Sequence, residues 1–178
     1  MFTLSNLKYL FFIFLLNACQ SKVQNLSVND SHLSLVDGVM LYEQQPYSGI
    51  LFSKTDTLTI YKVTYLKGQK HGMEQKYFHN GNLAQVRHYT KGKESGTHKA
   101  WWDKTQLMSE YHFDSVGNQI GLQREWHTNG QLAKEFNYNN GEESGAQKSW
   151  DFTGKIKANY VVINGERFGF IGSKNCKI

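Results

Sequence analysis

Glycines recur along this chain at a fixed interval, and this interval limits the fold more than any other feature of the sequence. Members of one series, here called the leading glycines, lie 24, 25, 24 and 24 residues apart: Gly72, Gly96, Gly121, Gly145 and Gly169. A second series precedes them by four residues at the same intervals: Gly68, Gly92, Gly117, Gly141 and Gly165. A period of this size indicates a repeat architecture. The sequence therefore predicts stacked units of about 24 residues.

Side chains between the glycines keep the same frame, and positions are counted from each leading glycine. Position 5 is aromatic throughout, as Tyr77, Trp101, Trp126 and Trp150. Positions 15 and 17 carry pairs such as Tyr111 and Phe113, with Arg87 as the departure from apolar character. Spacing by two is the alternation of a strand and differs from the 3.6-residue period of a helix. We therefore predict an all-β fold, a repetitive antiparallel β-hairpin meander with two strands per unit.

Asn-Gly pairs mark the turns of this meander. They favour type I′ hairpin turns, in which both central residues have positive φ, and stand at Asn80-Gly81, Asn129-Gly130, Asn140-Gly141 and Asn164-Gly165. Thr105 replaces the glycine of the first kind of turn in the second unit. The strands are predicted at 73–79, 82–90, 97–103, 106–114, 122–128, 131–139, 146–152 and 155–163, with further strands near 49–54, 58–66 and 166–171.

The first residues of the chain have the features of a secretion signal. Lys8 precedes an apolar run from Tyr9 to Leu16, which is shorter than the roughly 20 apolar residues that a membrane span needs. The run ends in Leu16-Asn17-Ala18-Cys19, which resembles the lipobox of bacterial lipoproteins and implies a lipid on Cys19. The alternative is an ordinary secreted protein in which a cysteine happens to follow the cleavage site.

These boundaries divide the chain into four parts. We predict a signal peptide over 1–18, a polar lipidated tether over 19–37, a repeat domain over 38–172 and a C-terminal tail over 173–178. The repeats lie near 49–71, 72–95, 96–120, 121–144 and 145–168.

The repeat frame resembles a known family. The pattern G-x₄-W/Y-x₂-N-G-x-L, followed by two alternating aromatic residues and N-G-x₃-G, is similar to the MORN-repeat variant of bacterial repeat proteins, many of which are assigned to toxin–antitoxin systems as antitoxins. The likeness covers about residues 47–172 and is specific for the repeat architecture. It implies a binding or scaffold role without chemistry of its own, and the antitoxin assignment would imply a toxin as partner.

Enzyme and metal motifs are missing from the sequence. We find no G-x-S-x-G, H-E-x-x-H, phosphate-binding loop or dinucleotide-binding glycine pattern, and we predict no catalytic residue, cofactor or metal. His88 and His112 share position 16 with Asn137, which indicates either a shallow metal or anion site or three solvated side chains. The other histidines of the repeats, His71, His79, His98 and His127, are interpreted as turn and surface residues.

A column of cations at position 3 is the first candidate binding feature. It consists of Lys99, Arg124 and Lys148, which alternation places on the same face as Trp101, Trp126 and Trp150. These residues either bind an anionic glycan, lipid headgroup or acidic protein through cation–π chemistry, or pack their stems over the rings. Trp102 belongs to no column, and it is either a partner contact or part of a second local core.

The net charge limits the partners that can be considered. Without the first eighteen residues the chain has 19 basic and 15 acidic groups, a surplus of +4, because Lys8 is the one charged residue removed. This charge is too low to predict nucleic-acid binding. We predict a non-catalytic, lipid-anchored protein of the bacterial cell envelope, periplasmic or surface-exposed, that binds a protein partner. The alternatives are an antitoxin-like binder of a toxin or effector, and a binder of anionic glycan or lipid.

Overall fold

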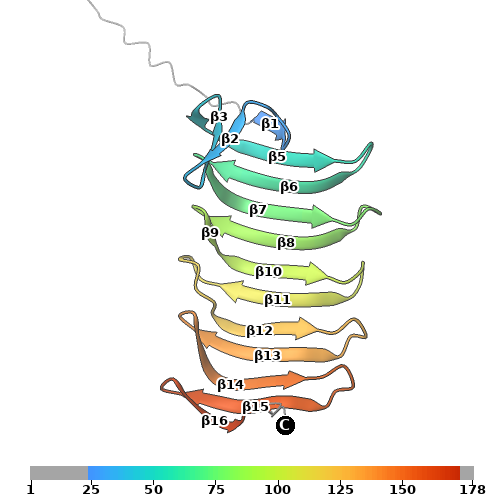
Figure 1. Cartoon of the computed structure of the whole chain (residues 1–178), viewed down its shortest axis with the longest axis vertical. Helices are drawn as coiled ribbons and strands as arrows, with labels where there is room; N and C mark the ends of the chain where they lie inside the picture. Colours follow the sequence, from blue (N-terminus) through green and yellow to red (C-terminus); the bar gives the residue numbers. More distant parts are fainter. Residues whose placement is uncertain (1–23, 173–178) are drawn as a thin grey trace, which may run out of the picture.

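The computed structural model describes residues 24–172, which form one long sheet and one small sheet (Figure 1). The predicted signal peptide, Cys19 and the C-terminal tail lie outside the described residues. The long sheet has 13 strands, ordered β1-β5-β6-β7-β8-β10-β11-β12-β13-β14-β15-β16, with β9 paired to β8. From β5 onward each strand pairs antiparallel with the next along this path. The prediction of an antiparallel hairpin meander is therefore confirmed.

The strands of the repeats lie close to their predicted ranges. They are β5 (Gly49–Lys54), β6 (Thr59–Leu66), β7 (Gln69–Tyr77), β8 (Leu83–Thr90), β9 (Lys93–Glu94), β10 (Gly96–Trp101), β11 (Leu107–Phe113), β12 (Gly121–Trp126), β13 (Leu132–Asn139), β14 (Glu142–Trp150), β15 (Ile156–Ile163) and β16 (Glu166–Phe170). Across residues 24–172 the structure contains no helix capable of crossing a membrane.

Strands at the N-terminal end correct the prediction of a tether. Residues predicted as its last two thirds form β1 (Gln24–Ser27) and β2 (Leu33–Val36), and β3 (Val39–Tyr42) and β4 (Gln45–Pro46) follow. β1 pairs in parallel with β5, and β2, β3 and β4 form the small sheet. Polar composition suggested a tether, but strand pairing and a few apolar side chains are enough to order this segment.

A small apolar core fixes this end of the sheet. It contains Leu26, Tyr47, Leu51 and Val63, each at most 9% exposed. The Tyr47 hydroxyl donates a hydrogen bond of 2.6 Å to the Gln24 carbonyl, which ties β1 to the body. Burial raises the pKa of Tyr47 to about 12. A Cβ on Gly49 would overlap the same carbonyl oxygen, so only glycine allows β1 to lie so close to β5.

Turns at the two ends of the hairpins have different geometry. Lys91-Gly92, Asn140-Gly141 and Asn164-Gly165 have positive φ at both residues, as type I′ turns require. At Asn80-Gly81 and Asn129-Gly130 only the glycine has positive φ, so the prediction of type I′ turns is wrong there. Each of these asparagines instead accepts a hydrogen bond through Oδ1 from the backbone N–H two residues later.

The second unit closes its turn without glycine. Asp103 Oδ1 accepts hydrogen bonds from the N–H groups of Thr105 and Gln106, at 2.8 and 2.9 Å. Thr105 has no positive φ. The carboxylate supplies locally what the glycine supplies in the other units, so the repeat continues through this departure.

Candidate functional site

Strand register defines the two faces of the sheet. Position 2 of each unit lies opposite position 15, as in His98↔Tyr111 and Gln147↔Tyr160, and we call this the inner face. Position 3 lies opposite position 14, as in Lys99↔Glu110, on the outer face. Most of the buried side chains of the repeats belong to the inner face, so this single-layer sheet covers its apolar surface largely with its own neighbouring side chains.

A column of polar residues is buried on the inner face at position 2. The four members of this buried polar column are Glu74, His98, Gln123 and Gln147, with exposed fractions of 5%, 4%, 2% and 0%. Sequence reasoning missed this column because it treated polar residues as surface. Strand alternation could have predicted this column, because position 2 lies opposite position 15 and therefore on the same face of the sheet. His98 in particular is a core residue, which corrects its interpretation as a surface histidine.

The two glutamines of the column replace missing strand contacts. Gln147 Oε1 accepts a hydrogen bond from the Asn137 N–H at 3.0 Å, and its Nε2 donates to the Asn137 carbonyl at 2.8 Å. Asn137 lies where the register between β13 and β14 shifts. Gln123 makes the same pair of hydrogen bonds with His112, at 2.8 and 3.0 Å. Each amide thus hydrogen-bonds both backbone groups of a position-16 residue, and the His112 carbonyl also accepts a bond of 3.0 Å from the Ile120 N–H.

Glu74 is a buried carboxylate held by three donors. The hydroxyls of Tyr61 and Tyr89 donate to it at 2.6 and 3.0 Å, and Lys70 Nζ lies 2.9 Å away. Burial alone would raise the pKa of Glu74, but hydrogen bonds from Tyr61 and Lys70 and the charge of Lys70 hold it below its ordinary value. The carboxylate is therefore ionised and paired, which suits a structural role.

His98 packs between two aromatic rings. Its ring centroid lies 5.9 Å from that of Tyr89 and 4.5 Å from that of Phe113, and its Nε2 lies 2.9 Å from the His88 carbonyl oxygen. Burial lowers the pKa of His98, since a charged ring would lose hydration in this position. Glu94 Oε1 lies 3.8 Å from Nδ1.

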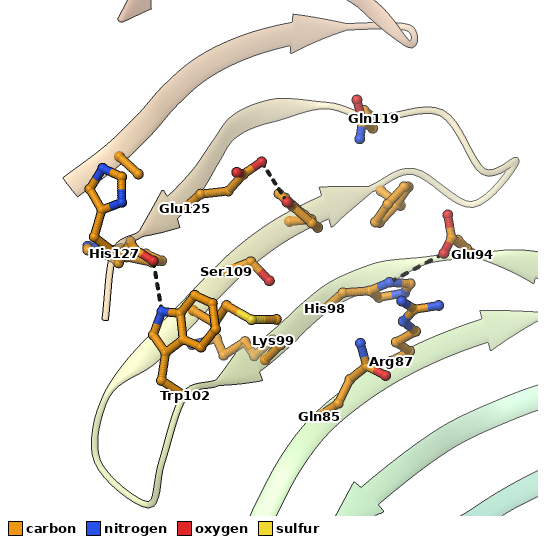
Figure 2. A pocket seen from close by; sticks show the side chains of 16 residues that line it. Gln85, Arg87, Glu94, His98, Lys99, Trp102, Ser109, Gln119, Glu125 and His127 are labelled. Atoms are coloured by element: carbon orange, nitrogen blue, oxygen red, sulfur yellow. Dashed lines mark hydrogen bonds and ion pairs between the residues drawn. The ribbon is translucent and has the colours of Figure 1, made fainter. Parts of the chain in front are cut away.

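A groove of about 580 Å³, here called the central groove, crosses the inner face beside His98 (Figure 2). Ala100 and Ser109 lie opposite each other in the register and form part of its lining, where small side chains leave space. Figure 2 shows Trp102 and His127 at one end, and Arg87, His98 and Glu94 at the other. The chain advances about 3.3 Å per residue in a strand, so the four-residue offset between His98 and Trp102 corresponds to about 13 Å.

Trp102 forms one end of the central groove and links two units. Its Nε1 donates a hydrogen bond of 2.8 Å to the Trp126 carbonyl, while 43% of the residue is exposed. His127 occupies the same position 6 in the next unit, and its Nε2 lies 3.1 Å from the Trp150 carbonyl oxygen. Trp102 therefore belongs to a column, and the prediction that it stands outside the frame is wrong. The indole N–H of Trp102 is hydrogen-bonded within the chain, and Trp102 also lines the central groove.

The predicted cation column is matched by carboxylates on the intervening strands. Lys99 lies 3.2 Å from Glu110, and Arg124 lies 3.0 Å from Glu135. Register places the alternating charges of Lys99, Glu110, Arg124, Glu135 and Lys148 in one line, here called the outer charge row.

Tryptophan rings do not pair with this row. The cation–π contacts found within residues 24–172 join Lys54 to Phe52, Lys70 to Tyr89, Lys134 to Phe136 and Arg167 to Tyr160. Trp101, Trp126 and Trp150 are half-buried at the ends of their strands, and Trp126 also lines the central groove. The lining of the central groove thus includes Trp102, Trp126 and Lys99, whereas Arg124, Lys148, Trp101 and Trp150 are not part of it.

The position-16 histidines are bridged by Thr97. His88 Nδ1 lies 2.9 Å from the Thr97 carbonyl oxygen, and Thr97 Oγ1 lies 3.0 Å from His112 Nδ1. Within the described part of the chain, no group of three or more His, Cys, Asp or Glu side chains is placed to hold a metal ion.

The leading glycines share a backbone with positive φ. All five have positive φ, between 65° and 120°. At Gly169 a Cβ would also lie 2.8 Å from the Asn159 carbonyl oxygen, so the last hairpin needs glycine for space as well as for backbone conformation.

The fold and its frame agree with a comparison against known families. A family model described as MORN repeat variant matches residues 70–91 and 119–140. These two segments cover β7 and β8 with their turn, and β12 and β13 with theirs. Proteins built of MORN repeats are generally associated with binding or scaffold roles. No curated protein matches the chain.

Proposed function

We propose that this protein is a non-catalytic, lipid-anchored scaffold of the bacterial cell envelope that binds a protein partner through the central groove. The observation that carries the proposal is the exposed indole surface of Trp102 beside a groove with small residues in its lining. Exposed tryptophan is enriched at the energetic centres of protein interfaces. A groove of this volume lies within the range of about 300–1,000 Å³ typical of ligand pockets.

The central groove suits an extended segment of a polypeptide. His98 and Trp102, at its two ends, lie four residues apart along β10 and the turn that follows it, so an extended segment of similar length can lie alongside. Charged groups occur in both signs around it: Arg87 stands near Glu94, and Glu125 accepts hydrogen bonds from Tyr111 at 2.8 Å and Lys134 at 3.4 Å. Nearly balanced charge favours a partner with mixed polar and apolar side chains over a strongly anionic ligand.

The alternative, a binder of anionic glycan or lipid, needs basic side chains without a carboxylate partner. In the outer charge row, Lys99 pairs with Glu110 and Arg124 pairs with Glu135. Glu110 and Glu135 each stand between two of the three cations. An antitoxin-like role would use the same groove with a toxin or effector as partner, and it is distinguished by the identity of the protein that is bound.

A substitution suggested by the chain itself tests the groove. Trp102→His introduces the residue found at this position in the next unit, where it contacts the following carbonyl. The variant should keep the link between units and lose the indole surface. We expect full-length wild-type protein, and the control Leu66→Ala at an exposed residue outside the groove lining, to recover one protein at near-stoichiometric yield from detergent-solubilised envelopes. Trp102→His should lose it, and equal recovery by that variant would contradict the proposal.

The anchor is tested separately, by intact-mass measurement of the protein purified from membranes. A lipidated Cys19 adds the mass of its acyl chains, and Cys19→Ala should lack this mass and leave the membrane fraction. An unmodified wild-type chain would contradict the lipid anchor and leave the groove proposal standing.

A further inference from the structure

The last strand of the long sheet is exposed along its whole length. All five residues of β16 are exposed, including Phe168 at 52% and Phe170 at 50%. Val161 lies directly opposite Phe168 on β15 and is 41% exposed, and nearby Ile163 is 55% exposed. These four side chains form an apolar surface at the C-terminal edge, here called the edge patch.

Comparison with the three preceding units shows that the edge patch is specific to the last hairpin. Val161 and Ile163 occupy positions 16 and 18 on the outer face. The same positions carry polar residues in the three preceding units: His88 and Thr90, His112 and Asp114, and Asn137 and Asn139. The outer face therefore changes from polar to apolar beside β16, the edge strand of the described sheet.

The opposite edge of the sheet has none of these properties. β1 has four residues, Gln24–Ser27, and its one apolar side chain, Leu26, is 9% exposed and packs into the N-terminal core. Short polar edge strands discourage pairing with other chains, whereas longer apolar edges invite it. An association in which β16 pairs with β16 uses one end of each molecule, so it closes at two copies.

We infer that β16 pairs antiparallel with β16 of a second copy, about a two-fold axis at Phe168. This register places Phe168 opposite itself, Arg167 opposite Gly169, and Glu166 opposite Phe170. Like charges are then never directly opposite, whereas a register centred on Arg167 would oppose two guanidinium groups. Arg167 is already fixed on the inner side by Glu143, 3.0 Å from its Nη2, and lies over the Tyr160 ring.

The exposed area sets the strength of this association. A phenylalanine buries roughly 150–250 Å² when fully covered, so each half-exposed ring contributes about 100 Å². The edge patches of two copies together bury less than the roughly 1,200 Å² of stable interfaces. We expect a reversible dimer with a dissociation constant of about 1 μM to 1 mM, which is the range of weak association.

Antiparallel edge pairing keeps the same face of both sheets on one side, since opposed residues point the same way. The two central grooves therefore face the same side of the dimer, and a partner with two binding segments would gain avidity. Pairing of β16 depends on the edge patch alone, so it does not rest on the groove proposal.

Sedimentation equilibrium over a concentration series tests the dimer. The wild-type protein should show a monomer–dimer equilibrium, and Phe168→Glu should remain monomeric at every concentration. Phe152→Glu, at a residue of similar exposure in a turn away from this edge, should behave as wild type. A wild-type chain that stays monomeric up to about 1 mM, a Phe168→Glu dimer, or growth beyond two copies would each overturn the inference.

Mixing two variants tests the two-fold axis. Phe168→Glu and Phe168→Lys should each be monomeric alone, since the axis opposes identical charges. An equimolar mixture should associate, because the axis then places opposite charges face to face. A mixture that stays monomeric would overturn the pairing of Phe168 with itself. Circular dichroism of each variant should match wild type, because residue 168 is an exposed edge position.

Discussion

The buried polar column has titratable members in its first half and neutral amides in its second, at the same position of the frame. Gln123 and Gln147 each pair with the N–H and the carbonyl of one backbone residue. His98 lies within reach of the carbonyl alone, and Glu74 instead gathers Tyr61, Tyr89 and Lys70. Position 2 therefore accommodates a buried polar side chain whose hydrogen-bonding groups have partners, and an amide, an imidazole or a carboxylate can meet this requirement.

Removing an amide should have the largest effect on stability. Gln147→Leu keeps most of the side-chain volume and leaves the N–H and carbonyl of Asn137 without this partner. An unsatisfied buried group costs about 1–3 kcal/mol, so we expect the free energy of unfolding to fall by about 3 kcal/mol. Urea denaturation measures the loss. The adjacent exposed substitution Lys148→Leu is the control, with an expected change within about 0.5 kcal/mol. Equal effects of the two would contradict the role of the amide.

The titratable half should make stability depend on pH in two windows. His98 and Glu74 both have lowered pKa values in the folded chain, with burial as the cause for His98 and donors to the carboxylate as the cause for Glu74. Between its folded and unfolded pKa values each group binds more protons when unfolded, so stability rises with pH. Stability is therefore lost as pH falls below about 6.5 for His98, and again below about 4.5 for Glu74.

Amide substitutions separate these windows. His98→Gln should remove the loss that begins near pH 6.5, because glutamine does not titrate and can reach the backbone of His88 as Gln123 reaches that of His112. Glu74→Gln should remove the loss at lower pH and lower stability at pH 7, since Lys70 then has no charged partner there. Denaturation midpoints from about pH 2 to pH 8 measure both effects. An unchanged profile in His98→Gln would show that His98 does not titrate in this range.

The repeat frame made most of the sheet predictable from sequence. Leading glycines, alternating aromatic residues and turn signals are local, so they set strand ranges within a few residues at β8, β11 and β13. Turn type was less predictable, because the Asn80 and Asn129 turns depart from type I′ geometry through the hydrogen bonds that their side chains accept. The geometry of a turn depends on its whole closing network.

Non-local contacts account for what the sequence did not indicate. β1 is polar and becomes ordered through parallel pairing with β5 and burial of Leu26, which no local pattern records. The buried polar column was present in the frame, but its residues are types that are mostly exposed in proteins. The central groove follows from the coincidence of Ala100 and Ser109 across two strands, which only register reveals.

The outer charge row gives the smallest expected effect and the sharpest contrast with the column. Glu135 lies opposite both Arg124 and Lys148, and the side chains of its pair with Arg124 are 40% and 29% exposed. Exposed ion pairs contribute about 0–1 kcal/mol and are screened by salt. Glu135→Gln should therefore lower the free energy of unfolding by less than about 1 kcal/mol at low salt, and by nearly nothing at about 1 M salt.

Gln147 lies on the facing strand β14, next to Lys148, which is opposite Glu135. Gln147→Leu should lose the same free energy at both salt concentrations, because the hydrogen bonds of Gln147 are neutral and buried. A salt-independent loss in Glu135→Gln would mean that the row is held by packing rather than charge.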